Sequence, residues 1–134
     1  MNQKYKPMNN LERVREFHEK FNVGIGVPID VNLINLRWDL IDEEAREVYD
    51  ELVYPATLEN IDKKKLTKEL ADLLYVTYGC AVHFGLPLQE VFEAVHESNM
   101  SKLGEDGKPI YREDGKVLKG PNYKEPDLEK YFAS

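Results

Sequence analysis

The amino-acid sequence predicts an all-α fold with four helices, and three observations lead to this prediction. Apolar residues recur every three or four positions in four separate stretches, as they do along one face of an α-helix. Glycine and proline separate these stretches from one another. No long stretch alternates between polar and apolar residues as a half-buried strand would. The four helices should therefore pack on one another around a shared apolar core.

The helices are expected at about 11–21, 30–53, 62–85 and 88–103. Asn9 or Asn10 can cap the first helix, and Asp30 can cap the second. Glycine or proline follows the second and third helices, where it stops the helical pattern. The second half of the third helix is apolar nearly all round, which predicts a central position in the bundle. The fourth helix gathers its apolar residues on one face, which consists of Leu88, Phe92, Val95, Asn99 and Leu103.

The segment after Gly104 has a different character from the helices. EDGKPIYR is followed at once by the near-repeat EDGKVLKG, and each copy begins with an Asp-Gly turn signal. The pattern fits a short hairpin and fits a lid-like loop equally well. The length of 134 residues predicts a single domain, 1–134, with core helices at about 9–103 and an irregular C-terminal segment at 104–134.

Composition narrows the possible partners. The net charge of −7 argues against binding a nucleic-acid backbone, which requires a basic face. Cys80 is the only cysteine, so no disulfide can form within the chain. The N-terminal residues lack the apolar core of a signal peptide. The weakly charged stretch 73–88 is too short and too interrupted to span a membrane. We expect a protein of the reducing cytoplasm, without a membrane partner.

Two sets of acidic residues are the most informative feature of the chain. At about 100° per residue, Glu44 and Glu47 project into the apolar arc of the second helix, and Glu43 lies at its edge. Glu69 and Asp72 are likewise three residues apart on the third helix, and 21 residues separate Glu47 from Glu69. Acids that face a core must be neutralised, paired or bound to metal. Basic residues are scarce beside them, so the sequence predicts a divalent metal ion held by carboxylate oxygens.

The pattern E-E-x-x-E, 21 residues, E-x-x-D resembles the signature of the MazG-like all-α nucleoside triphosphate pyrophosphohydrolases. That superfamily includes the dimeric dUTPases and the phosphoribosyl-ATP pyrophosphatases. The stretches VREFHEKF, ELADLLYVTYGCA, VFEAVHESNMSK and GKVLKGPNYKEPDL also look like its short single-domain members. The resemblance implies a four-helix bundle that is completed across the two chains of a homodimer or of a dimer of dimers.

The resemblance also implies an activity. Nucleoside triphosphates would be hydrolysed to the monophosphate and pyrophosphate with Mg²⁺, for which Mn²⁺ can substitute. The expected role is removal of dUTP or another dNTP from the nucleotide pool. Glu44, Glu47, Glu69 and Asp72 would be metal ligands. Glu43 would be an additional ligand or the group that activates water, so that Glu43, Glu44 and Glu47 form the catalytic set.

Substrate contacts are expected from residues nearer the C-terminus. The resemblance implies that Asn99 and Lys102 touch the substrate, and for Asn99 we favour this over the alternative of a helix-helix hydrogen bond. Arg112 and Lys119 are candidates to cover the phosphates, with solvated surface cations as the alternative. Trp38 can pack in a dimer or stack on a base. His18 and His83 are expected to be structural.

Two other functions fit parts of the sequence. A di-iron carboxylate bundle needs two E-x-x-H motifs. Only one is present, from Glu93 to His96. A metal-binding helical module that regulates or binds a partner without turnover is the non-enzyme alternative. The five acids required for turnover are all in place, which favours an enzyme.

Overall fold

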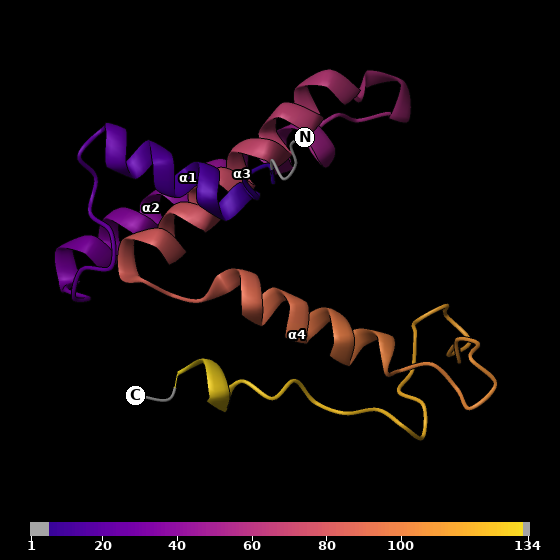
Figure 1. The fold of residues 1–134 in the computed structure, drawn as a ribbon. Helices are drawn as coiled ribbons and strands as arrows, with labels where there is room; N and C mark the ends of the chain where they lie inside the picture. The colour runs from indigo at the N-terminus through magenta and orange to yellow at the C-terminus, as the bar shows by residue number, and fades with distance from the viewer. Residues whose placement is uncertain (1–5, 133–134) are drawn as a thin grey trace, which may run out of the picture. The chain divides into compact units, whose positions relative to one another are not determined.

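The computed structural model describes residues 6–132 and confirms the all-α fold. Its helices are α1 (Asn10–Lys20), α2 (Val31–Leu52), α3 (Lys63–Phe84) and α4 (Leu88–Met100), as Figure 1 shows. The described residues contain no β-strand beyond one isolated bridge. The chain divides into two compact units, one ending at Leu86 and the other beginning at Pro87. Each unit is described by itself below.

Side-chain caps start the helices where the sequence predicts. Asn9 Oδ1 accepts from the backbone N–H of Glu12 at 2.8 Å, and the Glu12 carboxylate accepts from the N–H of Asn9 at 2.8 Å, which completes a capping box. Asp30 accepts from the N–H of Leu33 at 3.0 Å at the start of α2. Gly85 ends α3 with a φ of 67°, a left-handed conformation that glycine adopts without strain.

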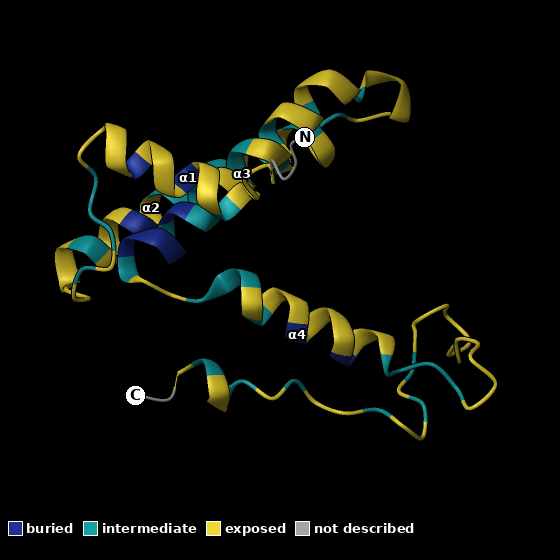
Figure 2. Cartoon of the chain, in the orientation of Figure 1, coloured by how far each residue is buried: buried dark blue, intermediate teal, exposed yellow. Residues whose placement is uncertain are grey.

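Helix α3 lies at the centre of the first unit, as predicted, because it packs against both α1 and α2. The buried apolar residues of this unit are few, and Val14, Ala81 and Val82 are the main ones (Figure 2). Many large apolar side chains elsewhere in the unit remain exposed, among them Val31, Trp38 and Tyr49. The first unit therefore has a small core and a broad apolar surface.

Three buried polar residues lie within that small core. Arg37 Nε donates a hydrogen bond to His83 Nδ1 at 2.9 Å, which connects α2 to α3. His18 Nδ1 donates to the carbonyl of Gly24 at 2.9 Å, which fixes the end of α1 to the following loop. A Cβ atom at Gly79 would lie 2.9 Å from Arg37 Nη1, so the glycine makes room for the guanidinium. Both histidines are buried and hydrogen-bonded, as expected for residues with a structural role.

The second unit forms where the C-terminal segment returns along α4. Ser98 Oγ donates to the carbonyl of Lys124 at 2.8 Å, and the N–H of Lys124 donates to Ser101 Oγ at 3.0 Å. The N–H of Gly120 donates to the carbonyl of Lys102 at 2.8 Å. A Cβ atom at Gly120 would meet backbone atoms of residues 102 and 103, so this close approach depends on glycine.

The apolar face predicted for α4 is not the face that is covered within this unit. Ala94 and Ser98 are buried, whereas Phe92 and Val95 are 62% and 39% exposed. Small side chains at 94 and 98 let the returning segment approach the helix, and the larger apolar residues are left uncovered. Asn99 is exposed, so it makes no buried helix-helix contact here. The helix also ends at Met100 instead of Leu103.

One of the two Asp-Gly turns closes a short hairpin. The N–H of Arg112 donates to the carbonyl of Lys116 at 2.8 Å, and the N–H of Leu118 donates to the carbonyl of Ile110 at 2.8 Å. Tyr111 and Val117 form the single antiparallel bridge. Gly115 has a φ of 90° at the turn. These bonds support the hairpin interpretation, and movement of the segment as a lid stays a prediction.

Among the described residues, no helix is long and apolar enough to cross a membrane.

We expect the stability of the metal-free protein to fall as the pH drops below about 6.5, relative to a His83→Asn variant. Burial, together with the charge of Arg37 and the neighbouring His18, lowers the pKa of His83, against a smaller opposite effect of Asp30. The unfolded chain therefore binds a proton that the folded chain resists, so stability is present above pH 6.5 and is lost below it. Asparagine keeps an acceptor at this position and does not titrate. Urea unfolding of both proteins from pH 7.5 to 5.5 measures the difference, and parallel curves would contradict the expectation.

Candidate metal centre

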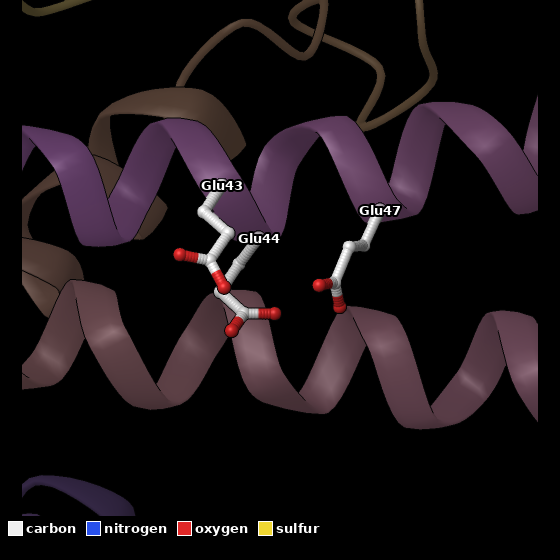
Figure 3. A group of neighbouring side chains, drawn as sticks. All are labelled: Glu43, Glu44 and Glu47. Carbon is white, nitrogen blue, oxygen red and sulfur yellow. The ribbon is translucent and has the colours of Figure 1, made fainter.

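Five carboxylates gather where α2 packs against α3. One ligand atom from each of Glu43, Glu44 and Glu47 can be chosen so that all lie within 4.8 Å of one another, and the same holds for Glu47, Glu69 and Asp72. Figure 3 shows Glu44 and Glu47 pointing from α2 toward α3. Glu47 belongs to both groups, so it connects the two acidic sets, which lie 21 residues apart in the sequence.

One oxygen in this cluster is buried without a hydrogen-bond partner. Glu44 Oε2 accepts no hydrogen bond from any residue in the described part of the chain, although the atom is buried. A buried carboxylate oxygen without a partner is costly, because it has lost its hydrogen bonds to water and forms none within the protein in their place. Such an atom indicates a missing positive partner at this place.

The electrostatics of Glu47 show how crowded the acids are. Hydrogen bonding with Glu69 and the negative charge of Glu44 raise the pKa of Glu47 to about 7. Like charges at this spacing disfavour the ionised form, so the cluster holds a proton more strongly than an isolated glutamate would. A divalent cation among the same oxygens would reverse this effect, since it stabilises the ionised carboxylates.

Basic residues are expected to be scarce beside the acids, and Lys68 is one that does lie there. Its Nζ lies 2.5 Å from Asp72 Oδ2 and 3.4 Å from Glu69 Oε1. These two carboxylates raise the pKa of Lys68 above its usual range. The lysine is largely exposed, so it neutralises the α3 acids from their solvent side and leaves Glu44 and Glu47 without a cationic partner among the described residues.

A hollow of about 400 Å³ adjoins the cluster on α2. It is lined by Asp39, Asp42, Glu43, Arg46 and Glu47. Arg46 Nη2 forms an ion pair with Asp42 at 3.1 Å, so its charge is directed at a neighbour on its own helix. The hollow gives a ligand access to Glu43 and Glu47.

The donor set fits a hard divalent metal ion. All the ligand atoms that the cluster offers are carboxylate oxygens, the donors that Mg²⁺ and Mn²⁺ prefer. The unpartnered oxygen of Glu44 and the raised pKa of Glu47 both indicate that the cluster is short of positive charge. No histidine belongs to either group in the described part of the chain, so these acids do not match the di-iron ligand set.

The predicted substrate contacts all lie in the second unit. Asn99 and Lys119 are exposed, and Lys119 Nζ lies 4.7 Å from the centre of the Tyr123 ring. Lys102 is half-buried. Arg112 donates from Nε to Asp114 Oδ1 at 2.9 Å and from Nη2 to Oδ2 at 2.5 Å, so its planar group is already occupied.

Sequence reasoning missed two residues of this region. Lys68 could have been found, since it precedes Asp72 by four residues, the spacing at which a helical lysine meets an acid. Arg37 precedes Glu44 by seven residues and so shares its helical face, but its burial also depends on the space that Gly79 leaves on α3.

The fold and the paired acids define the class of protein. They are those of the all-α nucleotide pyrophosphohydrolases, in which two helices each present an E-x-x-[ED] pair. The chain belongs to the phosphoribosyl-ATP pyrophosphohydrolase family, whose model matches residues 14–99, and thereby to the MazG-like superfamily. The match includes both acidic sets.

A solved structure is also similar to this chain. It is that of a candidate NTP pyrophosphohydrolase from Exiguobacterium sp. 255-15, with 26% sequence identity over 92% of each chain and a TM-score of 0.48. A TM-score below 0.5 does not establish a shared arrangement of the helices, so the assignment to the family rests on the family model.

Proposed function

We propose that this protein hydrolyses (deoxy)nucleoside triphosphates to nucleoside monophosphates and pyrophosphate, with Mg²⁺ bound at the acidic cluster. The observation that carries the proposal is the buried oxygen of Glu44, which lacks a partner among the described residues and belongs to a set of five convergent carboxylates. Membership of a pyrophosphohydrolase family supports the reaction class.

The residues that would hold the metal are Glu44, Glu47, Glu69 and Asp72. Bound Mg²⁺, or Mn²⁺ in its place, would supply positive charge against the phosphate oxygens and lower the pKa of a coordinated water. The protein's part is to hold these four carboxylates ionised and close together. Lys68 contributes by neutralising the outer side of Asp72 and Glu69.

Glu43 is the residue best placed to receive the proton of the attacking water. It is exposed and lines the hollow, so it remains open to a solvent molecule there. The oxygen of water forms a bond to the α-phosphorus. The P–O bond from the α-phosphorus to the α–β bridging oxygen breaks, and its electron pair leaves with pyrophosphate. The proton from water passes to the Glu43 carboxylate.

Asn99, Lys102 and Lys119 are proposed to contact the substrate. Lys119 is the strongest candidate for the phosphates, because its ammonium is exposed and rests only on the face of Tyr123. Arg112 would have to leave Asp114 before it could bind a phosphate, so it is the weakest of the four.

Removal of dUTP or another dNTP from the nucleotide pool is the role we favour. Phosphoribosyl-ATP is the second candidate substrate, because the family model that matches the chain carries that description. Both substrates contain the α–β phosphoanhydride bond and would use the same acids. Retention of all five acids argues against a module that only binds metal.

With Mg²⁺ present, a panel of ribo- and deoxynucleoside triphosphates and phosphoribosyl-ATP should yield a monophosphate and pyrophosphate from at least one member. Ion-exchange chromatography of the products identifies the bond that is cleaved. The same assay with EDTA should show no product, since the acids would then repel the triphosphate. Release of orthophosphate with a nucleoside diphosphate would exclude the proposed reaction.

Glu47→Gln and Asp72→Asn should each lower turnover by at least the roughly 10- to 100-fold that loss of an outer partner of a metal ligand costs. Both variants should unfold no more easily than the wild type without metal, because each removes one charge from a crowded cluster. Asp50→Asn, an exposed position on α2, is the matched control and should retain full turnover. A large loss of metal-free stability in both acid variants would instead mean that these carboxylates hold the fold.

A homodimer or a dimer of dimers is the assembly we expect. Val31, Trp38 and Tyr49 on α2 are 71%, 60% and 55% exposed, and apolar surface of this extent usually marks an interface. For Trp38 we therefore favour dimer packing over base stacking. Light scattering at micromolar concentration should give at least twice the chain mass of 15.6 kDa. A single species of the chain mass would contradict the expectation.

A further inference from the structure

The buried cation on α2 has no acidic partner. Arg37 is 6% exposed, and no carboxylate among the described residues forms an ion pair with it. Burial lowers the pKa of its guanidinium. A buried charge without a counter-charge is costly and is usually replaceable by an apolar side chain. Its presence therefore needs a reason other than stability.

Within residues 6–132, the one side-chain hydrogen bond of Arg37 crosses from α2 to α3. Arg37 Nε donates to His83 Nδ1 at 2.9 Å, and the histidine ring is 5% exposed. The ring has little freedom to turn. It stacks on Phe84 with 5.4 Å between ring centres, and a Cβ atom at Gly24 would lie only 2.8 Å from its Nε2. The acceptor therefore stands at a fixed point on α3.

The Arg37–His83 hydrogen bond and the acidic cluster require the same alignment of α2 on α3. Arg37 precedes Glu47 by ten residues, a rise of about 15 Å. His83 follows Asp72 by eleven residues, a rise of about 16 Å. Because α2 and α3 run antiparallel, the pair that joins Arg37 to His83 and the pair that brings Glu47 to Asp72 require nearly the same register.

The two ends of this helix pair are held differently. The connection at 53–62 joins α2 and α3 covalently near the acids. At the opposite end the loop before α2 is bound to the end of α3, since the N–H groups of Gly26 and Val27 donate to the carbonyls of Val82 and His83 at 3.0 and 2.8 Å. These bonds hold the loop, whereas a contact from α2 itself is needed to hold that helix in place against the repulsion of the carboxylates. The Arg37–His83 hydrogen bond lies at that opposite end.

We propose that the Arg37–His83 hydrogen bond is a positioning pair that sets the register of α2 on α3 and so holds Glu44 and Glu47 opposite Glu69 and Asp72. It acts through the helices, about 15 Å from the carboxylates, and touches neither metal nor substrate. The inference rests on the proposed metal site and deepens it, since it assigns the preorganisation of that site to residues outside it.

The decisive variant is Arg37→Met, measured by the affinity of the nucleotide-free protein for Mn²⁺. Methionine removes the donor and the buried charge but fills similar space, so the variant should fold with stability close to the wild type. Its Mn²⁺ affinity, followed by the spin-resonance signal of free Mn²⁺, should fall roughly 10- to 100-fold, as for loss of an outer partner of a metal ligand. Unchanged affinity would overturn the proposal.

Three histidine variants separate positioning from stability. His83→Leu removes the acceptor and should weaken Mn²⁺ binding as Arg37→Met does. His83→Asn places an amide oxygen near the position of Nδ1 and should restore the affinity. His18→Leu is the matched control, since His18 is also buried but bonds only to the loop carbonyl of Gly24. An equal loss of affinity in His18→Leu would reduce the effect to general destabilisation and overturn the proposal.

A second readout does not depend on metal. Spin labels at Ala45 on α2 and Lys64 on α3, both exposed, report the distance between the helices in a Cys80→Ala background. The distance distribution should be narrow in that background and should broaden or shift with Arg37→Met. If the wild type binds no Mn²⁺, the proposed metal site fails, and this distance measurement alone decides the positioning pair. An unchanged distribution would overturn it.

Discussion

Glu44 and Glu47 of α2 point across a helix-helix contact toward the helix that carries Glu69 and Asp72. Apolar side chains usually fill such a contact. This crowding of like charges opposes the packing that brings the acids together. Hydrogen bonding with Glu69 and the negative charge of Glu44 together raise the pKa of Glu47 to about 7. The apolar core of the first unit is small, so the metal-free helix pair has little to offset this repulsion. A bound divalent ion would turn the same carboxylates into a stabilising contact.

Two cations of the first unit, Lys68 and Arg37, act on this helix pair in different ways. Lys68 approaches Asp72 and Glu69 from solvent, where its charge is screened and its contribution is small. Arg37 lies in the core and forms no ion pair with the acids described, yet it makes the buried hydrogen bond between the two helices. Lys68 therefore lowers the repulsion between the carboxylates, and Arg37 opposes the movement of the helices that this repulsion favours. Neither forms an ion pair with Glu44, whose buried oxygen has no partner among the described residues.

The sequence predicted what depends on local chemistry. Capping residues and glycines set the ends of α1, α2 and α3 within a residue or two, because the orphan N–H and C=O groups at helix ends are satisfied locally. The acidic cluster was also predictable, since its spacing places both pairs on inward faces. Burial of Arg37 was not, because it depends on the space left by Gly79 on another helix. The covered face of α4 depends on a segment more than twenty residues away.

The exposed face of α4 bears on the assembly. Phe92 and Val95 lie on the face whose periodicity predicts burial, yet within the second unit the small residues Ala94 and Ser98 are covered instead. The apolar face of an amphipathic helix is normally buried, and the larger apolar residues of this face remain exposed within the unit. The first unit likewise leaves large apolar side chains exposed, at Val31 and Trp38. The apolar pattern therefore indicates which surfaces need covering, and the homodimer proposed above would cover them with a second copy of the chain.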